Sequence, residues 1–136
     1  MSGGENARLV GRWGEALVAE YLRRQGYKLL ATGYRCRMGE IDLIGTRNGI
    51  LAFVEVKTRQ DDHFGQGREF VDRRKQTRIL AAARQYLLDY PLGELQPRFD
   101  VAEVLAPEGR ATQEPEIYYL ENAFGAGGWS DAYTTF

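Results

Sequence analysis

The sequence predicts an α/β domain in which a mixed β-sheet is flanked by two helices. Three observations lead to this prediction. A segment with helical apolar spacing opens the chain, three strand-like segments follow in close succession, and a second helical segment separates them from two more strands. Because a helix connects the third strand to the fourth, we expect the fourth strand to run parallel to a strand of the preceding meander.

Two segments have the apolar spacing of amphipathic helices. The first is predicted over residues 6–25, where the apolar side chains recur at helical intervals: Val10, Trp13, Leu17 and Tyr21. Gly26 is expected to end it. The second helix is predicted from Asp72 to about Asp89, with Pro91 marking its end. Its expected apolar stripe contains Ile79, Ala82, Ala83, Tyr86 and Tyr90.

Five segments are predicted to be strands: residues 28–37, 40–47, 49–59, 98–105 and 116–122. Asn48-Gly49 lies between the second and third strands and is a strong signal for a two-residue hairpin turn. Such a turn pairs residues whose numbers sum to about 97, counted outward from Asn48 and Gly49. Gly33 is expected to form a bulge in the first strand. We therefore predict one domain over residues 1–122 and a mobile tail over 123–136.

Composition fits a single folded domain, because 43% of the 136 residues are hydrophobic and 27% are charged. The one cysteine, Cys36, cannot form an internal disulfide, which favours a reducing compartment. No apolar run approaches the roughly 20 residues that span a bilayer. The first residues also lack the apolar core of a signal peptide. We therefore expect a cytoplasmic protein with no membrane partner.

Charge is distributed unevenly along the chain. Residues 1–98 carry 17 Lys and Arg against 12 Asp and Glu, whereas residues 99–136 carry one Arg and seven acids. A basic body of this kind permits a surface that binds nucleic acid. Solvated charge on both parts of the chain explains the same composition equally well.

The third predicted strand contains two charged residues that do not suit a core. Side chains alternate along a strand, so Glu55 and Lys57 share one face with Phe53. The predicted register places Asp42 opposite Glu55, and two bare carboxylates there would repel each other. A Mg²⁺ or Mn²⁺ ion between them would remove that repulsion. The alternative is an ordinary cross-strand ion cluster, in which Lys57 neutralises both acids on an exposed face of the sheet.

The helices supply further candidates. Glu15 and Glu20 both border the apolar face of the first helix, so geometry alone cannot choose between them. The start of the second helix is the densest basic stretch and a candidate contact for a phosphate backbone. Its candidate residues are Arg73, Arg74, Lys75, Gln76 and Arg78, of which Lys75 and Gln76 are expected to face the sheet and the arginines to point outward. A solvated helix start is the alternative.

These residues together resemble a known family. The segments GRWGEALVAEYLRRQGY, GEIDLI, FVEVKTR and RFDV are similar to those of the YraN-like bacterial proteins. That family is assigned to the restriction-endonuclease-like PD-(D/E)XK nuclease superfamily and is similar in layout to archaeal Holliday-junction resolvases. The resemblance implies an αβββαβ core and covers roughly residues 8–105. One difference is that Ile41 stands where the superfamily pattern has proline before its first acid.

The resemblance also implies roles for particular residues. Asp42 would be the acid of the first motif, and Glu55 and Lys57 would be the (D/E)-X-K pair. Glu15 would be the additional helix acid of the metal site, which favours it over Glu20. Lys75 or Gln76 would support substrate binding. A symmetric substrate would suit a homodimer.

Three functions follow as hypotheses. The first is a Mg²⁺- or Mn²⁺-dependent endonuclease that cleaves DNA at branched or damaged positions, with metal held by Asp42, Glu55 and Glu15 and with Lys57 as the catalytic lysine. The second is a nucleic-acid-binding protein of the same fold without catalysis. The third is a protein-interaction subunit that docks through the acidic C-terminal portion or through aromatic residues of the tail: Trp129, Tyr133 and Phe136.

Overall fold

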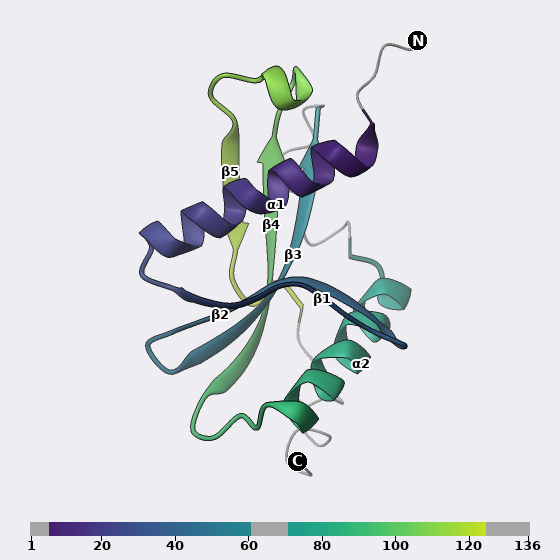
Figure 1. Cartoon of the computed structure of the whole chain (residues 1–136), viewed down its shortest axis with the longest axis vertical. Coiled ribbons are helices and arrows are strands. Elements are labelled where there is room, and N and C mark those ends of the chain that lie inside the picture. The colour runs from purple at the N-terminus through teal and green to yellow at the C-terminus, as the bar shows by residue number, and fades with distance from the viewer. Residues whose placement is uncertain (1–5, 61–70, 125–136) are drawn as a thin grey trace.

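A computed structural model of the chain describes residues 6–60 and 71–124. The predicted α/β class is confirmed: a mixed five-stranded sheet is combined with two α-helices (Figure 1). The elements in order are α1 (Ala7–Arg24), β1 (Lys28–Cys36), β2 (Gly39–Arg47), β3 (Ile50–Arg59), α2 (Arg73–Asp89), β4 (Gln96–Leu105), the 3₁₀ turn η2 (Gly109–Ala111) and β5 (Glu116–Leu120).

The strands lie side by side in chain order, β1-β2-β3-β4-β5. Only β3 and β4 pair in parallel, as expected for two strands joined by α2. The predicted hairpin is also confirmed, since Asn48 and Gly49 both have positive φ, 50° and 81°. Leu43 pairs with Val54, which is the register that the turn predicts.

The two helices cover opposite faces of the sheet. Alternate residues of β3 point to two separate cores, with Phe53 on the α2 side and Val54 on the α1 side. The α1 core contains Val18, Leu22, Leu43, Ala52, Val54, Ala102 and Val104. The α2 core contains Ile41, Phe53, Ile79, Ala83, Tyr86, Phe99 and Val101. Figure 1 shows α1 crossing in front of the strands. A sheet covered on both faces makes any acid in β2 or β3 costly unless it has partners.

Several details differ from the predictions. The register of β1 shifts between Leu29 and Ala31, so the predicted bulge at Gly33 is wrong. Gly33 instead adopts a φ of 66° without shifting the pairing. Tyr90, which was predicted to belong to the apolar stripe, is 60% exposed. It lies outside the stripe because α2 ends one residue earlier, at Asp89.

The end of the described chain is held by the core. Asn122 and Ala123 donate backbone hydrogen bonds to the Asp100 carboxylate and the Phe99 carbonyl. Phe124 stacks on Phe99, with ring centroids 5.3 Å apart. The predicted loop, apart from Gln60, and the tail aromatics lie outside the described residues. Within residues 6–60 and 71–124, no helix is both long enough and apolar enough to cross a membrane.

Candidate functional site

The site lies where β2 and β3 separate. The two strands pair from the turn as far as Leu43 and Val54. Beyond that pair, β2 stays with β1, while β3 continues beside β4 to Arg59. Asp42 and Glu55 are the first residues past the last pair. The Val56 amide donates a hydrogen bond of 2.8 Å to Asp42 Oδ2. If the two strands stayed paired, a backbone carbonyl would accept from this amide; here the Asp42 side chain accepts instead. We call this place the fork.

Three carboxyl groups meet at the fork, and we call them the acid cluster: Glu15, Asp42 and Glu55. The Asp42 carboxyl is in hydrogen-bond contact with Glu15 of α1 and with Glu55 of β3. Such a contact between two carboxyl groups requires a proton on one of them. As they stand, no three Asp, Glu, His or Cys side chains in the described parts of the chain are arranged to hold a metal ion.

The structure also separates the two acids of α1 that sequence left open. Glu20 faces away from the acid cluster and lies 3.3 Å from Arg24 and 3.8 Å from Arg23 in exposed ion pairs. Exposed pairs of this kind contribute little to stability. Glu15 therefore belongs to the acid cluster with Asp42, whereas Glu20 does not.

Burial and mutual repulsion disturb the protonation of the acid cluster. Burial raises the pKa of Asp42 to about 7, helped by the charges of Glu15 and Glu40 and opposed by the Val56 amide. Burial raises the pKa of Glu55 to about 7 as well, with Asp42 adding to it and Lys75 opposing it. The pKa of Glu15 is raised mainly by burial. Asp42 and Glu55 therefore keep protons up to near-neutral pH, because burial and neighbouring acids disfavour their charged forms.

The lysine that pairs with Glu55 is not the one expected in the ion-cluster alternative. Lys75 of α2 places Nζ 2.5 Å from Glu55 Oε2. Lys57 is exposed, and among the described residues no ion pair is found for it. The Lys57 side chain leaves the same face of β3 as Glu55, two residues further on. The cross-strand cluster neutralised by Lys57 is therefore not what forms here.

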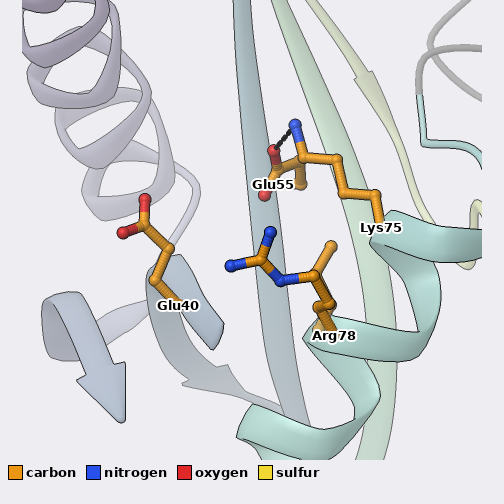
Figure 2. Close-up of a pocket in the computed structure, with 5 residues that line it drawn as sticks. Glu40, Glu55, Lys75 and Arg78 are labelled. Carbon is orange, nitrogen blue, oxygen red and sulfur yellow. Dashed lines mark ion pairs between the residues drawn. The ribbon is translucent and has the colours of Figure 1, made fainter. Parts of the chain in front are cut away.

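The basic residues of α2 divide into two groups. Lys75 and Arg78 line a cleft of about 330 Å³ together with Glu40, Glu55 and Ile79, which we call the α2 cleft. Figure 2 shows Lys75 reaching over Glu55 and Arg78 pointing between Glu55 and Glu40. Arg78 thus faces the acids, although it was expected to point outward.

The other candidates of α2 do not line this cleft. Gln76 donates a 2.7 Å hydrogen bond from Nε2 to the Val71 carbonyl, which ties it to the entrance of the helix. Arg73 and Arg74 are exposed. The first turn is held by Asp72, whose side chain accepts from the Lys75 amide at 2.9 Å.

A second cleft borders the acid cluster on the α1 side and was not anticipated from sequence. Its volume is about 700 Å³, and we call it the α1 cleft. It is lined by Arg8, Gly11, Arg12, Glu15, Gly33, Arg35, Glu40 and Asp42. Glu40 lines both clefts, so they adjoin at the fork. A sequence signal did exist, because Arg8, Arg12 and Glu15 are spaced to lie on one face of a helix.

Comparison with known proteins gives a family. The profile of uncharacterised protein family UPF0102 matches residues 14–104. The chain belongs to the UPF0102 family. A UPF0102 protein of Syntrophotalea carbinolica is 44% identical over 120 residues, which cover 88% of this chain and 94% of the relative. A UPF0102 protein of Caldanaerobacter subterraneus subsp. tengcongensis is 40% identical over 119 residues, 88% of this chain and 97% of the relative.

The UPF0102 match spans the acid cluster, Lys57 and Lys75, together with most of the sheet. A third relative, from Synechococcus, is 46% identical over 121 residues, which cover 85% of this chain and 90% of the relative. The names of these UPF0102 proteins state no reaction, so function has to follow from the chemistry of the fork.

Proposed function

We propose that this protein is a divalent-metal-dependent endonuclease that hydrolyses phosphodiester bonds of nucleic acid, with DNA as the expected substrate. The observation that carries the proposal is the contact between Asp42 and Glu55 at the fork, where burial holds both pKa values near 7. Strongly raised carboxyl pKa values in a cleft are characteristic of functional sites. The resemblance to the PD-(D/E)XK nuclease superfamily assigns the same residues.

The donor set fits a hard divalent cation. All three groups of the acid cluster offer oxygen atoms, and Mg²⁺ commonly uses one or two carboxylates and keeps water or phosphate oxygens as its other ligands. Asp42 and Glu55 would hold the ion, and Glu15 would contribute from α1. When bound, a divalent cation polarises the phosphate and lowers the pKa of a bound water. Its charge would also balance the repulsion that raises the two pKa values.

The two lysines near the acid cluster have different proposed roles. Lys75 neutralises Glu55 through an ion pair, so its ammonium group occupies the position of a counter-ion. Lys57 is exposed on the same face of β3 and is available to orient an attacking water or to stabilise charge on the phosphate. Lys57 is therefore the proposed catalytic lysine, and Lys75 is the counter-ion of Glu55 that a bound metal ion would replace.

Cleavage of labelled DNA by the full-length protein tests this function. Single-stranded, duplex and branched DNA would be incubated with Mg²⁺ or Mn²⁺, and products resolved on denaturing gels. We expect metal-dependent cleavage that falls at least about a hundredfold in Asp42→Asn, Glu55→Gln and Lys57→Ala, the usual size for one essential polar group. Glu20→Gln, prepared identically, controls for contaminating nuclease and should cleave normally. Absence of cleavage, or cleavage that survives Lys57→Ala, would reject the proposal.

A second candidate is a nucleic-acid-binding protein without catalysis. The ion pair between Lys75 and Glu55 favours it, because a protein cation already neutralises one acid of the fork. This candidate predicts binding that weakens with salt and needs no metal. Calorimetric titration with Mg²⁺ or Mn²⁺ distinguishes the two, since only the nuclease requires a binding isotherm that Asp42→Asn removes.

A further inference from the structure

Two glycines of α1 occur for different physical reasons. A Cβ atom added at Gly14 would lie 1.9 Å from Thr58 Oγ1, so this glycine allows the helix to pack against β3. A Cβ atom added at Gly11 would meet no described atom within 4 Å other than its chain neighbours and the backbone of its own helix. Glycine inside a helix is less favourable than alanine, because it loses more backbone freedom on folding. Packing among the described residues therefore does not account for Gly11.

The position of Gly11 suggests what it serves. Gly11 lines the α1 cleft one helical turn before Glu15, on the wall that leads to Asp42. Without a side chain, the helix backbone itself forms this part of the wall. Glycine is typical of places where a ligand approaches the backbone closely. The open space at Gly11 thus continues the cleft that begins at the acid cluster.

Arginines surround this open space. Arg8 and Arg12 flank Gly11 on α1, and Arg35 of β1 also lines the cleft. Arg35 forms an ion pair with Glu40 at 3.3 Å, but both side chains are more than half exposed, so the pair can open at little cost. Guanidinium groups match phosphate through paired hydrogen bonds. The α1 cleft therefore combines phosphate-binding cations with a bare stretch of backbone, directly beside the acid cluster.

We propose that the α1 cleft binds the sugar-phosphate backbone of one unpaired nucleic-acid strand. A phosphate next to the one being cleaved lies against Gly11, between Arg8 and Arg12. At about 700 Å³ the cleft has the size of a small-ligand site, which suits nucleotides of a single strand, whereas a duplex touches only its rim. The assignment rests on the proposed nuclease function and names its substrate as a single-stranded segment.

Substitution of Gly11 tests the cleft. A fluorescein-labelled oligothymidylate would be titrated with Gly11→Ala and Gly11→Leu in EDTA and low salt, followed by fluorescence anisotropy. We expect affinity to fall from glycine to alanine to leucine, by roughly tenfold for leucine, the equivalent of about 1.4 kcal/mol. The melting temperature should stay equal or rise, since both residues favour a helix more than glycine does. Unchanged affinity, or affinity that falls together with the melting temperature, would overturn the proposal.

Three further measurements sharpen the result. Arg12→Ala should weaken binding and reduce the salt slope by about one unit for the lost phosphate contact. Arg24→Ala on the same helix removes a cation that pairs with Glu20 outside the cleft, and it should bind like the wild type. A duplex carrying the same label should be insensitive to Gly11→Leu. An equal loss for duplex and single strand would contradict the assignment to an unpaired strand.

The two proposals fail in different ways. Normal strand binding by Gly11→Leu, combined with cleavage that Lys57→Ala abolishes, would overturn the cleft and leave the nuclease standing. Binding that depends on Gly11, combined with no cleavage under any metal condition, would support the cleft and overturn the nuclease.

Discussion

Two buried carboxylates of the same sheet, Asp42 of β2 and Asp100 of β4, differ in how well their surroundings satisfy them. Asp100 of β4 is fully buried and accepts two 2.9 Å hydrogen bonds from Arg98. It also accepts from the Tyr119 hydroxyl at 2.6 Å and from the Asn122 amide at 2.8 Å. Asp42 is only 8% exposed. Among the described residues, its carboxylate accepts one hydrogen bond from a backbone amide, that of Val56. The side chains that act most strongly on its pKa, Glu15 and Glu40, are acids.

The difference shows that burial does not by itself mark a functional acid. The charge of Asp100 is matched by a guanidinium group, and its oxygens have donors, as expected for a structural network. Burial and the Asp100 carboxylate raise the pKa of Tyr119, which keeps its hydroxyl protonated as a donor. At the fork the neighbours have the same charge, and the compensation is incomplete. Lys75 pairs with Glu55, but burial and neighbouring acids still raise the pKa values of both Asp42 and Glu55.

Removing Asp100 should cause the largest change in stability. Asp100→Ala removes the buried acceptor of two Arg98 hydrogen bonds, leaving Arg98 with the exposed Glu121 at 3.7 Å, and it deprives Tyr119 of its acceptor. We expect a loss of about 3–5 kcal/mol in the free energy of unfolding. Urea denaturation measures it. Asp42→Asn at pH 8 serves as the comparison and should leave stability equal or higher, because it removes an uncompensated charge and keeps an acceptor for Val56. Similar losses in both variants would erase the distinction between the two acids.

The pH dependence of stability should carry the signature of the fork. The folded-state pKa values of Asp42 and Glu55 are raised to about 7, above their ordinary values of 3.8 and 4.5. Between these limits the folded state binds more protons than the unfolded state, so stability falls as pH rises toward 7 and levels off above it. The change should be on the order of a few kcal/mol for the pair.

Comparison of the wild type with Asp42→Asn/Glu55→Gln isolates this contribution. Chemical denaturation would be repeated in EDTA from pH 4 to pH 8. The double variant should lose most of the downward slope, whereas Glu20→Gln should keep it. The difference in stability between the wild type and the double variant should therefore decrease as pH rises. If the wild type instead gained stability relative to the double variant, the raised pKa values would be contradicted.

Metal should stabilise the folded protein only when the acid cluster is ionised. Added Mg²⁺ or Mn²⁺ should raise the melting temperature at pH 8, by the equivalent of about 2.7 kcal/mol at a hundredfold excess over the dissociation constant. Protons compete for the same oxygens, so the effect should be small at pH 5. Differential scanning fluorimetry with Asp42→Asn as the control measures this. A shift of equal size in Asp42→Asn would place the metal elsewhere.

Lys75 offers the smallest and most specific test. Its side chain is 47% exposed, so Lys75→Ala should change the unfolding free energy by less than about 1 kcal/mol. If its ammonium group stands in for a cation at Glu55, its removal should strengthen metal binding at pH 8.5, a change that isothermal calorimetry detects. Weaker binding in Lys75→Ala than in the wild type would assign the lysine a supporting role instead.

Local sequence predicted the fold and much of the fork. Asn48-Gly49 sets the hairpin register, and that register alone placed Asp42 against Glu55. What sequence could not predict depends on contacts between distant elements. Beyond the fork β2 and β3 separate: β2 pairs with β1 and β3 pairs with β4, and each β3–β4 pair joins residues 46 positions apart, as in Ile50 and Gln96 (96 − 50). A local pattern contains no information about where that separation begins.

The assignment of partners was equally beyond local pattern. The choice of Lys75 for Glu55 depends on how α2 docks on the sheet, and the choice of Glu15 over Glu20 depends on the rotation of α1. The predicted bulge at Gly33 was wrong for a related reason. The register instead shifts beside Leu30, which is 41% exposed on an edge strand where packing constrains the chain least.

The stacking of Phe124 on Phe99 has a practical consequence for anyone who shortens or fuses this chain. The folded unit does not end with β5, because Asn122 supplies a donor to the fully buried Asp100 and Phe124 fills part of the α2 core. A truncation after Leu120 would therefore remove a piece of the interior rather than a loose end. Any fusion partner should therefore be joined beyond residue 124.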